Sequence, residues 1–200
     1  MKGDTLTKKI RNWSLFAATL ALSGCISFGG EVPQQMISLT PERAAPVGAA
    51  VSGKISDAIV VFDPEASRRL DVLRVPVRID SSAVAYLKDA MWVEKPARQF
   101  RQLLAETIRA KTGRLVLEGG ETEAIARHTL SGRLIDMGYD ARSGSVTVTY
   151  DAVRTAKGGG VEARRFTASM PAVQAEAGSV GRALNEAAND VAVQVADWIG

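Results

Sequence analysis

The chain contains 200 residues, 46% of them apolar, with a formal charge of +3, one cysteine and one histidine. This length fits one domain and can bury a hydrophobic core without crosslinks, and the apolar content excludes a disordered chain. The single cysteine excludes an intramolecular disulfide and a cysteine-based metal cluster, and the single histidine excludes a multi-histidine metal site.

Residues 1–24 have the pattern of a bacterial lipoprotein signal peptide. Basic residues precede the apolar run 13–22, which is too short to cross a membrane comfortably. The run ends in Leu22-Ser23-Gly24-Cys25, which resembles a lipobox. This resemblance implies cleavage between Gly24 and Cys25 and acylation of Cys25, so that Cys25 carries a lipid anchor. The alternative is an N-terminal transmembrane anchor, which the serines and glycines of residues 23–30 disfavour.

Cleavage would change the charge of the protein. The signal holds four basic residues and one acidic residue, so the mature chain would carry 21 of each sign. A neutral mature chain gives no basis for nucleic-acid binding. In the lipoproteins that the lipobox resembles, Asp directly after the lipidated cysteine favours retention in the inner membrane. Ile26 stands at that position, which indicates the outer membrane, on its periplasmic face.

The mature chain divides into two parts. Residues 25–54 are rich in Gly, Pro, Ala and Ser, which predicts a lipidated, flexible tether with one short strand at 35–39. Residues 55–200 are predicted to form a single periplasmic α+β domain. Its first strands are expected at 55–62, 73–79 and 83–88. The middle one alternates strictly, but Pro76 cannot donate a ladder hydrogen bond and therefore favours an edge or an irregular ribbon.

Two long segments have helical periodicity. Residues 95–112 have Pro96 in the first turn and Gly113 after the last, and residues 179–199 carry an apolar stripe with Ser179 as the expected N-cap. Between them, strands are predicted at 115–117, 129–137, 145–153 and 164–170, with a Gly-rich turn at 157–160. Residues 145–153 alternate, with Val146, Val148 and Tyr150 on one face and Thr147, Thr149 and Asp151 on the other. The expected fold class is α+β, a mostly antiparallel sheet with two amphipathic helices packed on one face.

Candidate partner-binding residues are few. Arg74 and Arg78 share the outward face of one predicted strand and could meet lipid head groups or an acidic partner, although a solvated face is the simpler interpretation. Trp92 is interpreted first as a core residue where helix meets sheet, and second as a partner-facing anchor. Trp198, on the apolar stripe of the last helix, is expected in the core.

Other polar features favour structural roles. His128 stands at a predicted strand start and no nucleophile motif accompanies it. The acidic group Glu118, Glu121 and Glu123 lacks the spacing of a calcium loop and is interpreted as a polar loop. Gly158-Gly159-Gly160 precedes a strand rather than a helix, so it indicates a hairpin turn and not a phosphate loop. We therefore expect no catalytic residue, no metal site and no cofactor.

Together these features resemble the ABC-type transport auxiliary lipoprotein family, of the paraquat-inducible protein C type. The segments that carry the resemblance are the lipobox at Cys25, Met36-Ile37-Ser38-Leu39, Ile59-Val60-Val61-Phe62, Ala85-Tyr86-Leu87, Met91-Trp92-Val93-Glu94-Lys95-Pro96 and the amphipathic helix from Phe100. The resemblance implies a non-enzymatic component of an intermembrane lipid transport system. Such systems join an ABC ATPase and permease to a periplasmic protein with mammalian cell entry (MCE) domains. The implied role is to dock this assembly at the outer membrane, with self-association into a homo-oligomer.

Two other functions stay open. Small α+β lipoproteins also serve as assembly or regulatory components of other envelope machines, such as activators of cell-wall synthases, and fold alone does not separate these roles. A periplasmic hydrolase is disfavoured because the sequence lacks a nucleophile constellation.

Overall fold

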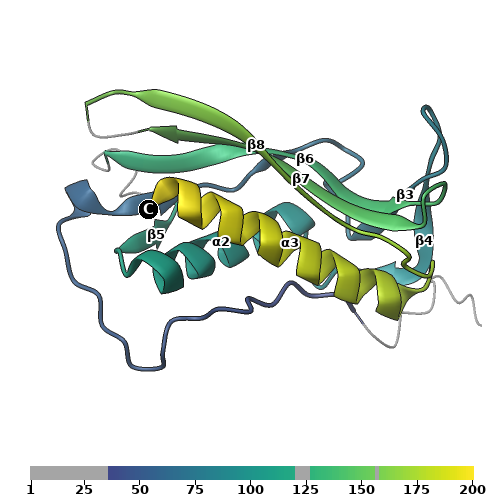
Figure 1. The fold of residues 1–200 in the computed structure, drawn as a ribbon, viewed down its shortest axis with the longest axis horizontal. Helices are drawn as coiled ribbons and strands as arrows, with labels where there is room; N and C mark the ends of the chain where they lie inside the picture. The colour runs from purple at the N-terminus through teal and green to yellow at the C-terminus, as the bar shows by residue number, and fades with distance from the viewer. Residues whose placement is uncertain (1–35, 120–126, 156–157) are drawn as a thin grey trace, which may run out of the picture. The chain divides into compact units, whose positions relative to one another are not determined.

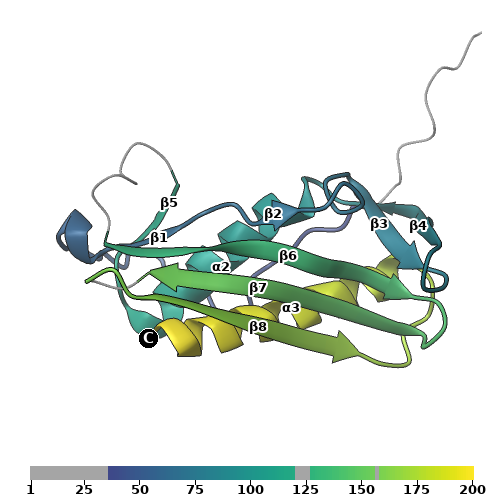
Figure 2. The same cartoon turned by 90° about the horizontal axis from the view of Figure 1, so that it is seen from above.

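The computed structural model describes residues 36–119, 127–155 and 158–200. Three long antiparallel strands form the largest part of the sheet: β6 (His128–Asp140), β7 (Ser145–Thr155) and β8 (Val161–Met170) (Figure 2). β7 pairs with β6 on one side and with β8 on the other. Val146, Val148 and Tyr150 are buried on one face of β7. This confirms the alternation predicted for residues 145–153.

Short strands line the other edge of β6 one after another. β1 (Ile59–Val61), β2 (Glu65–Ala66) and β3 (Arg74–Arg78) each pair parallel with a successive part of β6. Beyond them, β5 (Val116–Glu118) pairs parallel with β1, and β4 (Val84–Met91) pairs antiparallel with β3. The strand predicted at 55–62 is shorter than expected, because a 3₁₀ turn, η1 (Ile55–Asp57), occupies its start.

The predicted edge position of β3 is wrong, because β3 lies between β4 and β6. Pro76 is tolerated inside the sheet because β6 pairs with β3 only at Val77 and Arg78, after the proline. On the other side, the pairing with β4 shifts in register between Arg74 and Pro76. The irregular ribbon that Pro76 also indicated is therefore present.

Both helices cover the same face of the sheet (Figure 1). α2 (Pro96–Thr112) begins at Pro96 and ends before Gly113, whose φ of 63° is the left-handed conformation that glycine adopts without strain. α3 (Ala177–Ile199) buries the predicted stripe from Val180 to Val195. The predicted fold class, an α+β domain with a mostly antiparallel sheet and two helices on one face, is confirmed.

α3 differs from the prediction at both ends. It begins at Ala177 with Glu176 as the N-cap residue, so Ser179 is not the cap and instead accepts a weak hydrogen bond from Arg182. Trp198 is only partly buried. Its ring packs against Phe166 with 5.5 Å between centroids, at the margin of the core rather than inside it.

The core lies between the helices and the sheet. Among the described residues Trp92 is the largest fully buried side chain, and Phe100 of α2 meets Tyr150 of β7 edge to face at 5.3 Å between centroids. This contact joins a helix to the central strand through two rings, a geometry that aromatic pairs favour.

The folded part begins before the predicted boundary at residue 55. The short strand expected at 35–39 is a single bridge in which Ile37 pairs parallel with Trp92. After it, backbone N–H groups donate to helix side chains: Leu39 to Gln99, Thr40 to Asn185 and Ala45 to Glu106, at 2.7–2.9 Å. The buried Asn189 also accepts from Glu42 and donates to the Thr40 carbonyl. Residues 37–45 are therefore part of the domain, and the tether predicted for 25–54 extends too far.

Candidate functional site

The helices leave the opposite face of the sheet uncovered, and this outer face is built from polar side chains. Alternation along each strand sends Thr147 and Asp151 of β7 away from the core. Hydroxyls meet across the strands on this face, with Thr147 to Ser169 at 2.9 Å and Thr149 to Thr167 at 3.2 Å. Cross-strand hydroxyl pairs of this kind stabilise the sheet and keep this face polar.

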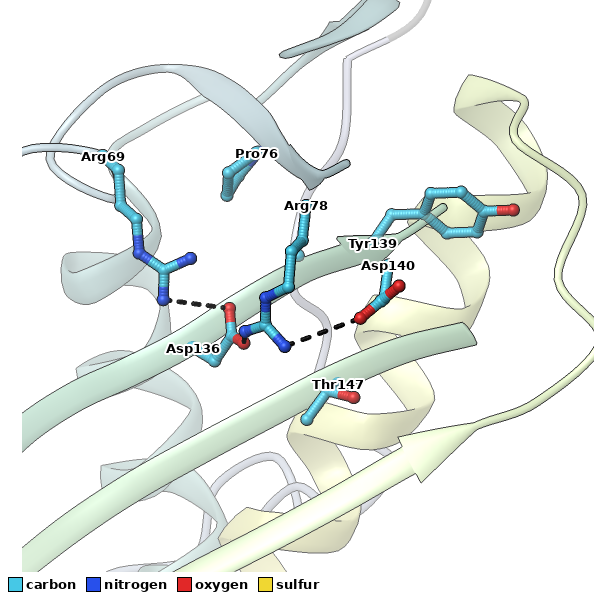
Figure 3. Close-up of a pocket in the computed structure, with 8 residues that line it drawn as sticks. Arg69, Pro76, Arg78, Asp136, Tyr139, Asp140 and Thr147 are labelled. Carbon is cyan, nitrogen blue, oxygen red and sulfur yellow. Dashed lines mark hydrogen bonds and ion pairs between the residues drawn. The ribbon is translucent and has the colours of Figure 1, made fainter. Parts of the chain in front are cut away.

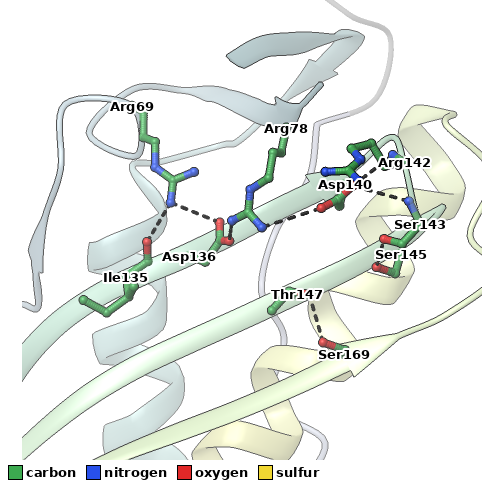
Figure 4. A network of polar contacts seen from close by, with 10 residues as sticks. All are labelled: Arg69, Arg78, Ile135, Asp136, Asp140, Arg142, Ser143, Ser145, Thr147 and Ser169. Atoms are coloured by element: carbon green, nitrogen blue, oxygen red, sulfur yellow. Dashed lines mark hydrogen bonds and ion pairs between the residues drawn. The ribbon is translucent and has the colours of Figure 1, made fainter. Parts of the chain in front are cut away.

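Four charged residues form a network at one part of this face (Figures 3 and 4). Arg78 of β3 pairs with Asp136 of β6 and lies 3.6 Å from Asp140. Arg69, from the segment between β2 and β3, reaches the same Asp136 at 3.4 Å. Asp136 thus holds two arginines that are distant from it in the chain.

A β-bulge positions this network. The pairing of β6 with β7 shifts between Leu134 and Asp136, so Ile135 is the additional residue. The Ile135 carbonyl accepts a hydrogen bond from Arg69 at 2.8 Å. The side chains around Asp136 enclose a void of about 10 Å³, which is room for about one water molecule. The network is therefore a structural tie between segments and not a ligand pocket.

Asp140 ends β6 and organises the turn into β7. Its Oδ1 accepts hydrogen bonds from the backbone N–H groups of Arg142 at 2.9 Å and Ser143 at 3.3 Å. These bonds, the Arg142 one first, keep the pKa of Asp140 below its ordinary value, although partial desolvation acts in the other direction. The same carboxylate faces Arg78, so the turn and the network share one charge.

A wider groove crosses the outer face toward β1 and β2. Its volume is about 880 Å³. The row Arg133–Asp151–Arg165 lies in register across β6, β7 and β8 beside it. Asp151 accepts two hydrogen bonds from Arg165, at 2.5 and 2.6 Å. Arg133 is the more available cation, because its side chain is 65% exposed and its ion pair with Glu65 is long, at 3.7 Å.

Small residues and charged residues together line the groove. Ser131, Gly132 and Ala163 are the small ones, and Phe62 with Asp63 comes from the segment after β1. Such a surface can receive a protruding segment of a partner and pair with its charges. Shape and charge of this kind fit a binding surface.

Acid should weaken the Asp151–Arg165 pair. The hydrogen bonds from Arg165 lower the pKa of Asp151 below its ordinary value of 3.8. The ionised Asp151 carboxylate therefore contributes fully to stability above pH 3.8. This contribution is lost as the pH falls through the lower pKa that Asp151 has in the folded state. We expect the free energy of unfolding, measured by urea titration across the acid range, to fall less steeply in Asp151→Asn than in the wild type. At neutral pH the variant should lose little, because water screens exposed pairs. An unchanged acid slope would contradict this assignment.

The predicted partner-binding residues have separate positions. Arg74 is exposed and its guanidinium carbon lies 4.5 Å from the Tyr86 ring centroid. Arg78 belongs to the Asp136 network and does not form a free cationic face with Arg74. Trp92 is 0% exposed, which confirms the core interpretation and corrects its placement among partner-binding residues. Gly24 and Cys25 lie outside the described residues.

The other polar features occupy ordinary positions. His128 is the first residue of β6 and is partly buried. Glu118 pairs with Arg101 at 3.3 Å, whereas Glu121 and Glu123 lie outside the described residues. Gly158 and Gly159 have positive φ in the turn before β8, as a hairpin requires, and Lys157 lies outside the described part.

Sequence reasoning missed the charged residues that matter most on the outer face: Arg69, Arg133, Asp136, Asp151 and Arg165. The alternation of β7 already assigned Asp151 to the polar side. Its partners could not be found in the same way, because register across strands depends on the folded sheet.

Within the parts of the chain that the structure describes, no group of three or more His, Cys, Asp or Glu side chains is arranged to hold a metal ion. No helix among the same residues is long and apolar enough to cross a membrane.

Comparison with solved structures places the fold among known ones. A crystal structure from Xanthomonas campestris, of the family DUF330, aligns with a TM-score of 0.60 at 17% identity, covering 83% of this chain and 91% of that chain. A crystal structure of an uncharacterized protein aligns at 0.61 with 11% identity, covering 72% and 93%. A PelC dodecamer from Paraburkholderia phytofirmans aligns at 0.44 with 13% identity, covering 69% and 86%.

The search of curated proteins found no match to this chain. The sequence does match a protein family: residues 38–196 match the family described as the ABC-type transport auxiliary lipoprotein component. The match begins beside Ile37, the first buried residue of the described chain, and ends within α3. It therefore spans the sheet and both helices, and the chain belongs to the ABC-type transport auxiliary lipoprotein family.

Proposed function

We propose that this protein is a lipid-anchored, non-enzymatic accessory component of an MCE-type intermembrane lipid transporter, which it docks at the outer membrane. The observation that carries the proposal is the family match over residues 38–196, since the family is described as an auxiliary lipoprotein component of ABC-type transport. The lipobox ending at Cys25 supplies the anchor, and Ile26 after it favours the outer membrane.

The outer face of the sheet is the surface we assign to the transporter. The groove of about 880 Å³ lies there, with the exposed Arg133 at its margin. The helix-covered face is already occupied by α2 and α3 (Figure 1). The expected partner is the periplasmic MCE-domain protein, and several copies of this chain in a homo-oligomer would present several such grooves.

The proposal predicts which partner is crosslinked, and from which face. A photo-crosslinking amino acid replaces Arg133 in intact cells, and captured proteins are identified by mass spectrometry. The matched control replaces Arg98 on α2, whose side chain is 59% exposed compared with 65% for Arg133. We expect an MCE-domain protein from position 133 and much less of it from position 98.

Two results would contradict this function. Capture of a cell-wall synthase without any transporter subunit would favour an assembly or regulatory role in another envelope machine. Equal capture of the MCE protein from both positions would remove the assignment of the groove. Cys25→Ser is the control for the anchor: it should leave an unprocessed precursor or a mislocalised protein and reduce the crosslink.

A further inference from the structure

Exposed apolar side chains lie at the point where the described chain enters the domain. Ile37 and Trp92 form a bridge and both are buried, so their neighbours Met36 and Val93 lie on the opposite, outer side. Met36 is 41% exposed and Val93 is 49% exposed. Exposed apolar residues are common singly, but these two occur on one short stretch of surface.

Three further side chains belong to the same surface. Arg74 is in register with Met91 across β3 and β4, and its guanidinium stacks on Tyr86. We call these five residues the tether-side patch: Met36, Arg74, Tyr86, Met91 and Val93. Arg and Tyr have an apolar body with a polar tip, a combination that suits the boundary between hydrocarbon and water.

Chain length limits how far this patch can lie from the proposed anchor. Met36 is eleven residues after Cys25, and a chain of that length spans at most about 40 Å in any conformation. The opposite end of the sheet is farther away. β8 runs ten residues from Val161, about 30 Å at the rise of a strand, and it ends at the same end of the sheet as β3 and β4 (Figure 2).

We propose that the tether-side patch rests on the phospholipid bilayer that holds the protein's own lipid anchor. The inference rests on the lipidation of Cys25 in the proposed function. We infer a bilayer and not a protein partner because the lipid anchor holds the domain beside the membrane at all times. The effective concentration of the bilayer is therefore high, and a weak contact is enough. A stable protein interface needs about 20–30 residues on each side, and the patch offers five. The contact orients the domain, so that the outer-face groove is presented at a set angle to the membrane.

The test uses the full-length, processed protein in vesicles of phosphatidylethanolamine and phosphatidylglycerol. Val93→Cys is labelled with an environment-sensitive fluorophore, and quenching by doxyl-labelled lipid and by aqueous iodide is measured. The matched control is Val161→Cys, another exposed valine, 65% exposed, at the far end of β8. Because Cys25 is the only native cysteine, one label per chain shows that it is blocked by lipid, and two labels show that it is free.

We expect doxyl quenching to be several-fold stronger at position 93 than at position 161, with the reverse order for iodide. Equal, weak doxyl quenching at both positions with one label per chain would overturn the patch while leaving the anchor intact. Shielding of position 93 from iodide without doxyl quenching would assign the patch to a second copy of the chain and also overturn the inference. Two labels per chain, or loss of the protein from floated vesicles, would overturn the anchor and the inference with it.

Discussion

Trp92→Ala should destabilise the domain by about 3–5 kcal/mol, the range for removing a large aromatic side chain from a core. Trp92 is the largest fully buried side chain among the described residues. It lies where three segments meet: its backbone N–H donates to the Leu73 carbonyl at 2.8 Å, and it forms the bridge with Ile37. Because a domain is stable by only about 5–15 kcal/mol, this loss is a large part of the total.

Trp92→Phe is the matched control and should cost clearly less. The indole Nε1 is buried with no hydrogen-bond partner among the described residues, and phenylalanine removes this polar group while it keeps most of the ring. Urea unfolding of the three proteins measures the difference. Equal losses in the Ala and Phe variants, or none in either, would contradict the core assignment.

The same pair of variants separates packing from partner binding. At a temperature where Trp92→Ala is still folded, crosslinking from position 133 should equal that of the wild type, because the indole does not reach the surface. Loss of the crosslink without loss of stability would mean that Trp92 contacts the partner.

Gly132→Ala should be the second severe change, with a loss of roughly 3 kcal/mol from overpacking and backbone strain together. Gly132 has φ of 151°, a conformation that L-residues rarely adopt. An added Cβ would overlap the Asp151 carbonyl oxygen and come within 2.9 Å of the Tyr150 ring. The Tyr150 hydroxyl donates to the Ser131 carbonyl at 2.8 Å, so this ring cannot move away without breaking that bond.

Gly160→Ala provides the control for Gly132. Gly160 is in the turn before β8, has no positive φ, and an added Cβ meets nothing within 4 Å among the described residues. The stability of the Gly160→Ala variant should stay close to that of the wild type. Similar melting temperatures for Gly132→Ala and Gly160→Ala would show that β6 and β7 can separate locally. The prediction that the close approach at Gly132 requires a glycine would then be wrong.

Position 132 also links stability to the groove. Gly132 lines the groove, and a Cβ added there would press on the Asp151 carbonyl and the Tyr150 ring, so it would displace the backbone that carries Arg133 and Asp151. A variant that remains folded at reduced temperature should therefore show a weaker crosslink from position 133. Stability and binding would then change together at one glycine, whereas Trp92→Ala changes stability alone.

Periodicity was enough for the helices and for β7, because their patterns are local. The apolar positions of residues 179–199 recur at helical spacing, and Pro96 and Gly113 mark the two ends of α2. The same local rule was only partly right for β3, where the irregular ribbon is present but the edge position is not. Pro76 favoured an edge, but a proline is excluded from an inner strand only where its neighbours need its N–H, and β6 pairs beyond it.

The family, the lipobox ending at Cys25 and the α+β class follow from the sequence by itself, because each depends on residue types at short spacing. Tertiary structure alone decided that Arg78 joins Asp136, that Trp92 is inaccessible, and that Arg133 stands at the margin of a groove. These facts depend on strand register and on a bulge at Ile135. The physical reason is that a strand pattern tells which residues share a face, whereas the partner across the sheet is set by pairing between segments tens of residues apart.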